Sequence, residues 1–176
     1  VKKHTHKNIE LIVVSDGSSD DTFTVAVKSL GSDLPGRVVE FVKNSGSHAA
    51  IRCGLELARG DAVAVISADG QDSPEILPKM LDQLGAGIDV VWGRRASRDA
   101  DSWLTRFLAS TYYHLFRLLT GLDYPAAGLD FLVMSRPVID ATNTFQERNL
   151  PLFLAIFNLG FGQAYIDYDR DARVAG

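Results

Sequence analysis

The stretch Ala62-Val63-Ala64-Val65-Ile66-Ser67-Ala68-Asp69-Gly70-Gln71-Asp72-Ser73-Pro74-Glu75 decides the expected fold. Its first part, residues 62–66, is an unbroken apolar run and predicts a strand that is buried on both faces. A small polar turn follows, and Pro74 then begins a helix with a serine cap before it. The strand therefore delivers Asp69 and Gln71 to its C-terminal edge, where open α/β sheets bind their ligands.

The polar turn after this strand is a candidate metal site. Asp69 and Gln71 are hard oxygen ligands at alternate positions, and such ligands suit Mg²⁺ or Mn²⁺ beside phosphate groups. An aspartate at the end of a strand is also a common helix cap or turn former. The turn alone leaves both interpretations open.

Composition limits the possible classes of protein. The chain has 176 residues, of which 46% are hydrophobic and 23% charged, as expected for a single globular domain spanning residues 1–176. A net charge of −4 gives no general attraction to nucleic acid. The single Cys53 excludes an intrachain disulfide and a cysteine-cluster metal site. No apolar run reaches the length of a membrane span, and the start at Val1 without Met leads us to expect a fragment.

Short strands alternate with helices along the chain, and glycine turns join them. This alternation predicts βαβ units in a mostly parallel, Rossmann-like α/β sheet with helices on both faces. The expected strands are 11–14, 37–42, 62–66, 88–92, 131–134 and 162–168. The expected helices are 22–30, 48–58, 74–84, 103–119, a short one from Pro137, and 149–159.

Polar side chains follow the first three expected strands. They are Asp16 with Gly17 and Ser18, then Asn44, then Asp69. Because parallel strands that follow one another in βαβ units all end at the same edge, we expect these side chains to gather there. That convergence predicts a ligand site at this edge.

The expected helix 103–119 has a wide aromatic face that includes Trp103, Phe107 and Tyr112. Arg106 and Arg117 interrupt this face. The pattern fits a core helix with an overfull apolar side, and it also fits a helix that meets a membrane surface or an apolar substrate. Both interpretations stand at this point.

Several short motifs occur in the order that is typical of one enzyme family. Taken together they resemble family 2 glycosyltransferases of the GT-A fold, in the branch of dolichol-phosphate mannose synthase and bacterial undecaprenyl-phosphate glycosyltransferases. The motifs are Val14–Asp20; Asn44–Gly46 with Ala49, Ala50 and Gly54; Arg59–Asp61; Ser67–Glu75; Gly93–Arg95; Gly128–Phe131 with Met134–Arg136; and Leu159–Gln163.

The resemblance implies a donor site for a nucleoside diphosphate sugar and a divalent cation. Asp69 and Gln71 would hold Mg²⁺ or Mn²⁺, which would neutralise charge on the leaving diphosphate. The residues implied in binding the nucleotide are Asp16, Gly17, Ser18, Asn44, Arg52 and Asp69.

The resemblance also implies an acceptor side, at about residues 93–176. Asp130 and Arg95 are its implied catalytic residues, and Arg94, Arg95 and Arg98 its implied phosphate-binding residues. Two other interpretations remain. Asp130 can instead cap a strand or pair with Arg136, and the arginines can form a solvated salt-bridge patch with Asp99 and Asp101.

The chain departs from the family pattern at several places. Ser15 and Ser67 stand where the family often has aspartate, and Gly70 stands in place of leucine. A metal would therefore depend on Asp69, Gln71 and the phosphates of the nucleotide. The family's first strand and helix are absent, and many relatives continue into transmembrane helices just beyond Gly176. We therefore expect a catalytic domain that is truncated at both ends.

Three functional hypotheses follow. The first is an inverting, metal-dependent hexosyltransferase that acts on a polyprenyl phosphate of the cell envelope, associated with the cytoplasmic face of the membrane. The second is a family 2 transferase with a polysaccharide or other soluble acceptor. The third is a nucleotide-binding relative without turnover. The departures from the family pattern at Ser67 and Gly70 support this hypothesis.

Overall fold

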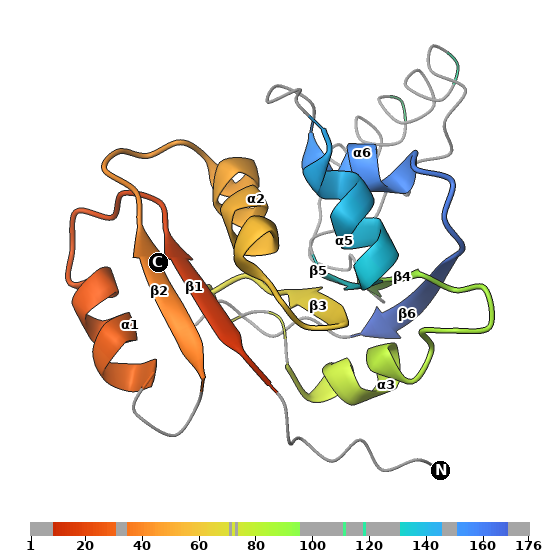
Figure 1. Ribbon diagram of the computed structural model, residues 1–176, viewed down its shortest axis with the longest axis horizontal. Helices are drawn as coiled ribbons and strands as arrows, with labels where there is room; N and C mark the ends of the chain where they lie inside the picture. The colour runs from red at the N-terminus through yellow and green to blue at the C-terminus, as the bar shows by residue number, and fades with distance from the viewer. Residues whose placement is uncertain are drawn as a thin grey trace. The chain divides into compact units, whose positions relative to one another are not determined.

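The computed structural model describes residues 9–30, 35–70, 72, 74–95, 111, 118, 131–145 and 151–168 (Figure 1). Its contacts divide the chain into two compact units, and we describe each by itself. The first unit comprises Val1–Val63 and Ser135–Ile156, and the second comprises Ala64–Met134 and Phe157–Gly176.

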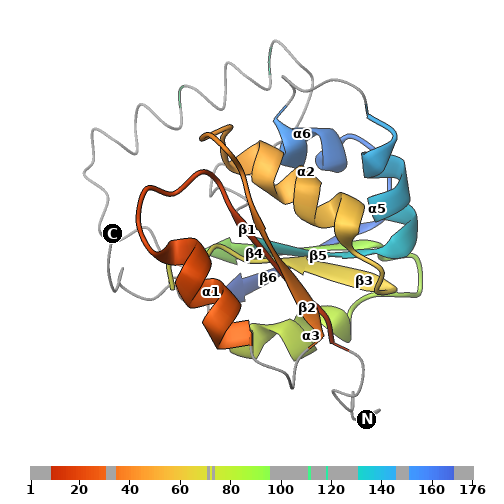
Figure 2. The same ribbon diagram turned by 60° about the vertical axis from the view of Figure 1, so that its left-hand side comes forward.

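The first unit begins with a strand–helix–strand segment. Strand β1 (Leu11–Ser15) pairs in parallel with β2 (Gly36–Glu40), from Leu11 opposite Gly36 to Ser15 opposite Glu40. Helix α1 (Thr22–Leu30) connects them, and α2 (Ser47–Leu57) follows β2. The two helices lie on opposite sides of the strand pair (Figures 1 and 2). The expected βαβ unit with helices on both faces is confirmed here.

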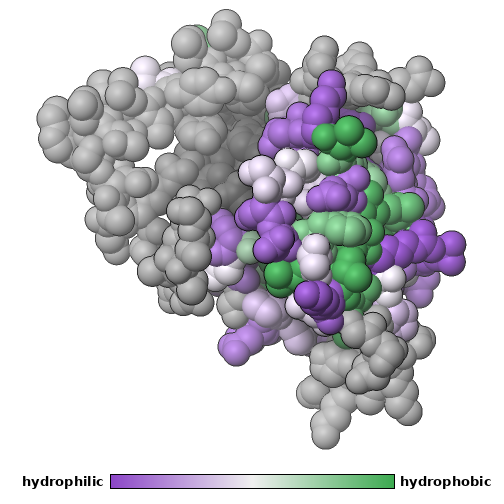
Figure 3. Space-filling view, turned by 90° about the vertical axis from the view of Figure 1, so that its left-hand side faces the viewer, coloured by the Kyte–Doolittle hydropathy of each residue, from purple (hydrophilic) through white to green (hydrophobic). Residues whose placement is uncertain are grey.

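The helices of the first unit differ in how much they bury. Helix α1 buries none of its residues, and Val25 and Val27 are 57% and 48% exposed. Figure 3 views the molecule from this side and shows hydrophobic side chains gathered among hydrophilic ones. By contrast, α5 (Arg136–Asn143) and α6 (Leu152–Phe157) carry regularly spaced buried residues, namely Val138, Ile139, Thr142, Leu152, Ala155 and Ile156.

A four-stranded sheet has the strand order β3-β5-β4-β6. Its members are β3 (Ala62–Val65), β5 (Phe131–Ser135), β4 (Val90–Arg95) and β6 (Gln163–Tyr168). Strand β4 runs parallel to β6 and antiparallel to β5. The sheet is therefore mixed, with β5 as the antiparallel strand.

The expectation that residues 62–66 form a strand buried on both faces is wrong. Strand β3 stands at one end of the strand order, none of its residues is buried, and Ile66 is 37% exposed. The buried strands are β4 and β5, in which Val90–Trp92 and Phe131–Met134 have 0% exposure. An apolar run alone does not distinguish an end strand rich in alanine from a strand inside the sheet.

The core of the second unit lies between the sheet and a short helix. Its buried cluster contains Met80, Val91, Phe131, Val133 and Tyr168. Met80 comes from α3 (Leu77–Leu81), which contacts β4 and covers one face of the sheet (Figure 2). The expected helix 74–84 begins at Pro74 as the 3₁₀ turn η1 (Pro74–Ile76) and ends at Leu81, earlier than expected.

Within the described ranges, no helix is long and apolar enough to cross a membrane. The expected helix 103–119 lies outside those ranges except for Thr111 and Leu118, so both interpretations of its aromatic face stay predictions. The single catalytic domain over residues 1–176 also stays a prediction.

Candidate functional site

The turn after β1 is tied to the turn after β2 by one carboxylate. Asp16 accepts a hydrogen bond from Ser45 N at 2.7 Å through Oδ1 and another from Gly46 N at 2.8 Å through Oδ2. Because β1 and β2 are parallel, their C-terminal ends lie together, as expected for Asp16 and Asn44. Both oxygens of Asp16 thus hold the loop that contains Asn44.

The backbone of this turn requires glycine at position 17. Gly17 has φ of 67°, and a Cβ there would lie 2.5 Å from the carbonyl carbon of Lys43 and 2.6 Å from Asn44 N. Ser15 is buried at 4% exposure, and its hydroxyl donates to Ser18 Oγ at 3.2 Å. Gly17 therefore allows the two strand ends to approach each other, and Ser18 contacts Ser15 within the turn after β1.

The turn after β3 also contains an Asp-Gly pair with a left-handed glycine. Asp69 is half-buried, and Gly70 has φ of 70°. Gln71 lies outside the described residues. Asp72 in this turn is 3% exposed and accepts a hydrogen bond from the hydroxyl of Tyr168 at 2.6 Å. Sequence reasoning missed this pair, because the two residues are 96 positions apart and no local pattern connects them.

The side chains of the turn after β3 suit a cation that is bound partly by the protein and partly by phosphate groups. Among the described residues there is no group of three or more His, Cys, Asp or Glu side chains that could hold a metal. Asp69 is the described carboxylate that the sequence predicts as a ligand, and Asp72 in the same turn accepts a hydrogen bond from Tyr168. Mg²⁺ is commonly bound by one or two carboxylates together with water and substrate phosphates. The residues present fit that arrangement and do not fit a metal centre built from protein alone.

Arg94 lies inside β4 rather than after it. Its guanidinium forms an ion pair with the acidic side chain of Asp167. Arg94 Nε is 2.6 Å from Asp167 Oδ1, and Arg94 Nη2 is 3.1 Å from Asp167 Oδ2. The hydrogen bond from Arg94 holds the pKa of Asp167 below its ordinary value, and Asp167 in turn raises the pKa of Arg94. The guanidinium also stands over the ring of Tyr165 at 5.6 Å.

Other members of the predicted acceptor side fall outside what the structure describes. Arg95 belongs to β4 through its backbone, and the described chain does not include its side chain, Arg98 or Asp130. The salt-bridge alternative for the arginines named Asp99 and Asp101, which also lie outside. For Arg94, the observed acidic partner is Asp167.

Arg52 extends from α2 toward the end of α5. Its Nη1 donates to the carbonyl oxygen of Phe145 at 3.3 Å. Near this contact, Asn143 Nδ2 donates to the carbonyl oxygen of Leu55 at 3.4 Å. Arg52 therefore helps to join two helices of the first unit, a role that the sequence did not indicate.

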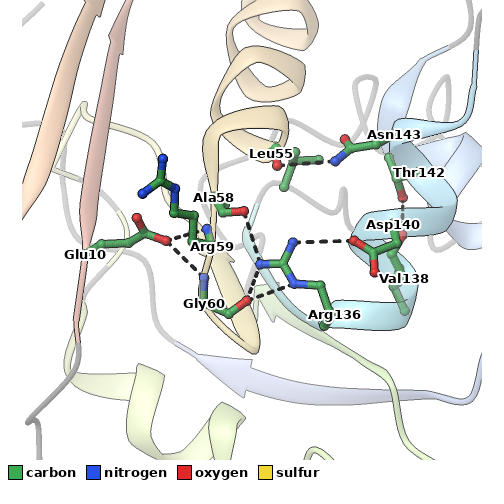
Figure 4. A network of polar contacts seen from close by, with 10 residues as sticks. All are labelled: Glu10, Leu55, Ala58, Arg59, Gly60, Arg136, Val138, Asp140, Thr142 and Asn143. Atoms are coloured by element: carbon green, nitrogen blue, oxygen red, sulfur yellow. Dashed lines mark hydrogen bonds and ion pairs between the residues drawn. The ribbon is translucent and has the colours of Figure 1, made fainter.

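Two motifs of the sequence analysis meet in one polar network, shown in Figure 4. The guanidinium of Arg136 donates to the carbonyl oxygens of Ala58 at 3.2 Å and Gly60 at 3.0 Å, and it pairs with Asp140 at 3.5 Å. From the other side, Glu10 Oε1 accepts from Arg59 N at 2.5 Å and Gly60 N at 3.0 Å. Contacts between the segments Arg59–Asp61 and Met134–Arg136 thus fix the backbone that leads into β3.

A family model described as "Glycosyl transferase family 2" matches residues 1–153. The chain belongs to glycosyl transferase family 2. This finding confirms the family that the motifs indicated.

Relatives of this family 2 chain include proteins named for polyprenyl lipids. It is 32% identical to the bactoprenol glucosyl transferase of Shigella phage SfX over 168 residues, which is 96% of this chain and 55% of that protein. It is also 32% identical to the undecaprenyl-phosphate 4-deoxy-4-formamido-L-arabinose transferase of Aeromonas hydrophila over 166 residues, or 93% and 49% of the two chains. The chain spans about half the length of the curated relatives it matches.

Solved structures confirm the GT-A fold of this family 2 chain. The mannosyltransferase PcManGT from Pyrobaculum calidifontis, solved with GDP-Man and Mn²⁺, superposes with a TM-score of 0.64 at 16% sequence identity. The match covers 94% of this chain and 48% of that one. The mixed α/β architecture with a mostly parallel arrangement and flanking helices is the one expected from the sequence.

Proposed function

We propose that this chain is the catalytic region of an inverting glycosyltransferase that moves a sugar from a nucleoside diphosphate sugar to a polyprenyl phosphate. The observation that carries the proposal is the 32% identity, across nearly the whole chain, to relatives named for bactoprenol and undecaprenyl phosphate. Such an acceptor places the reaction at a membrane, and we propose its cytoplasmic face.

On the donor side, Asp69 and Gln71 are the proposed ligands of Mg²⁺ or Mn²⁺. A bound cation of this kind supplies a Lewis acid that neutralises charge on the departing diphosphate. The mannosyltransferase from Pyrobaculum calidifontis, which has the same fold, was solved in complex with GDP-Man and Mn²⁺, and this supports the assignment. The hard oxygen of Asp69 is the contribution of the described chain.

The nucleoside is proposed to bind at the turns after β1 and β2. Asp16 is engaged with two backbone N–H groups of the Asn44 loop. Its proposed contribution is therefore to shape the surface that Gly17, Ser18 and Asn44 present to the nucleoside. Arg52, on the helix α2 that follows this loop, is the proposed basic neighbour of the nucleotide.

On the acceptor side, the attacking group is the phosphate of the lipid. A phosphate monoester is mostly ionised at pH 7, so its oxygen attacks the anomeric carbon without a strong general base. Asp130 is proposed to orient this phosphate, and Arg95 and Arg98 to bind phosphate oxygens in the planar, bidentate manner that guanidinium groups allow. Arg94 is left out of this set because Asp167 occupies its guanidinium.

An acceptor competition tests the proposal. The chain is incubated with UDP, GDP and dTDP sugars and Mn²⁺, with either a short polyprenyl phosphate in detergent or free sugars as acceptor. The proposal predicts transfer to the lipid phosphate with inversion at the anomeric carbon, and loss of transfer when EDTA removes the metal. Transfer only to free sugars would support the soluble-acceptor hypothesis instead. Failure to release any nucleoside diphosphate would support the relative without turnover.

A further inference from the structure

A buried hydrogen bond connects the Asp69 turn to the last strand of the second unit. The hydroxyl of Tyr168 donates to Asp72 Oδ1 at 2.6 Å, a short distance typical of a hydroxyl bonded to a carboxylate. Asp72 is 3% exposed and Tyr168 is 8% exposed, so the bond lies away from water. Asp72 stands three positions after Asp69, and the bond therefore fixes the turn that carries the proposed metal ligand.

Tyr168 is held firmly enough to act as an anchor. Its backbone lies opposite Arg95 in the parallel pairing of β6 with β4. Its ring packs edge-on against Phe131, with centroids 5.8 Å apart and planes at 81°. Gly93 lies under both rings, and a Cβ there would be 2.9 Å from Phe131 and 3.0 Å from Tyr168. Close packing of this kind leaves the phenol few alternative rotamers.

Because the hydrogen bond between Tyr168 and Asp72 is buried, its loss would affect the conformation of the turn. A buried carboxylate that loses a hydrogen-bond donor incurs a desolvation cost, and relaxation of its backbone is one way to reduce that cost. Residues that orient the ligands of a metal usually have a strong effect on the affinity of the protein for that metal, even though they do not contact the metal themselves. In the same way, the Tyr168 hydroxyl would orient Asp69 indirectly, because it bonds to Asp72 in the turn that also contains Asp69.

We propose that Tyr168 is a positioning residue, whose hydroxyl holds the turn after β3 so that Asp69 binds the divalent cation of the nucleotide complex. This inference rests on the proposed function. It adds a residue that acts through Asp72, at a position that the sequence analysis did not select. Tyr168 does not touch the nucleotide or the reacting atoms in this role.

The test is Tyr168→Phe, which removes the hydroxyl and keeps the ring against Phe131. Calorimetry measures the binding of UDP and GDP at a series of Mn²⁺ concentrations, at a temperature where the variant is folded. We expect the Mn²⁺ concentration for half-saturation to rise about tenfold. Hydrogen–deuterium exchange without metal provides a second readout, and we expect faster exchange in peptides covering residues 64–74.

Two controls separate positioning from general stability. Tyr165→Phe makes the same chemical change on the same strand at a side chain that is 37% exposed, and we expect it to alter neither readout. Val133→Ala weakens the same buried cluster without touching the hydrogen bond. It should lower the melting temperature and leave the Mn²⁺ dependence unchanged.

The outcomes are distinct. A wild-type chain that binds no nucleoside diphosphate with Mn²⁺ contradicts the proposed function, and the positioning role fails with it. A wild-type chain that binds while Tyr168→Phe shows the same Mn²⁺ dependence and exchange overturns the positioning role alone. An equal rise in the Mn²⁺ concentration for half-saturation in Val133→Ala also overturns it, because stability would then explain the effect.

Discussion

The turn after β1 and the turn after β3 look alike in sequence, yet different carboxylates hold them. Each has an Asp-Gly pair whose glycine has a positive φ, 67° at Gly17 and 70° at Gly70. In the first turn the leading aspartate, Asp16, is tied by two backbone N–H groups. In the second turn Asp72, three residues after Asp69, accepts a hydrogen bond from the phenol of Tyr168 on a distant strand.

This difference shows that the position of an aspartate in a turn does not determine its role. Asp16 accepts from two backbone donors at once, which is the arrangement of a structural carboxylate. In the second turn Asp72 has a structural role through its bond to Tyr168. The ligand role there is proposed for Asp69 because its hard oxygen follows the end of β3. The comparison predicts that substitutions in the first turn affect mainly stability, whereas those at Asp69 affect mainly metal-dependent binding.

The largest expected effect is at Gly17. Gly17→Ala adds a Cβ against the backbone of residues 43 and 44 and imposes a left-handed φ on alanine. We expect a loss of more than about 4 kcal/mol in the free energy of unfolding, measured by urea denaturation.

The matched control is Gly46→Ala, at a glycine with φ of 92° where an added Cβ meets nothing within 4 Å. Its cost comes from backbone strain alone, and we expect about 2 kcal/mol. If the two variants lose the same stability, the close approach at Gly17 is not what shapes the turn.

The next effect is at Asp16. Asp16→Ala removes two charge-assisted hydrogen bonds at a partly exposed site, and we expect a loss of about 2 kcal/mol by urea denaturation. Asp16→Asn should lose nearly as much, because an amide nitrogen cannot accept a hydrogen bond from a backbone N–H. Asp21→Ala, at an exposed aspartate nearby, should change stability by less than about 0.5 kcal/mol. Wild-type stability in both Asp16 variants would show that the tie does not hold the first turn.

The smallest effect concerns a carboxylate outside both turns. Arg94 lowers the pKa of Asp167, so the pair stabilises the folded state above the ordinary value of 3.8 and loses this contribution as the pH falls through the lowered value. Both side chains are about half exposed, and solvent screening keeps the effect small. Stability curves of the wild type and Asp167→Asn should therefore converge on acidification below pH 3.8. A difference that stays constant down to pH 2 would exclude the ion pair as its source.

The sequence predicted the regular elements better than their surroundings. Helix 22–30 was placed with the correct bounds, because the glycine turns on its two sides, with Gly17 and Gly31, are local signals. The burial of β3 was wrong, since a run such as Ala62–Ile66 contains no information about which strands flank it. Arg94 was placed after a strand and lies within one, because its pairing with β6 depends on residues far along the chain.

The candidate site shows the same limit. The turn residues were selected correctly as strand-end positions, since parallel strands place their ends at one edge. The partners of these side chains were not predictable, because Asp72 meets Tyr168 and Arg136 meets Gly60 only after the chain has folded. The expected place of Asp69 beside Asp16 stays a prediction.

The central claim is that Asp69 binds the divalent cation that binds the nucleotide. Calorimetry of UDP and GDP binding with and without Mn²⁺, on the wild type, Asp69→Ala and Ser67→Asp, tests it most directly. We predict Mn²⁺-dependent binding in the wild type, its loss in Asp69→Ala, and equal or tighter binding in Ser67→Asp, which adds a charged oxygen two positions away. Binding by Asp69→Ala with the same Mn²⁺ dependence as the wild type would contradict the claim.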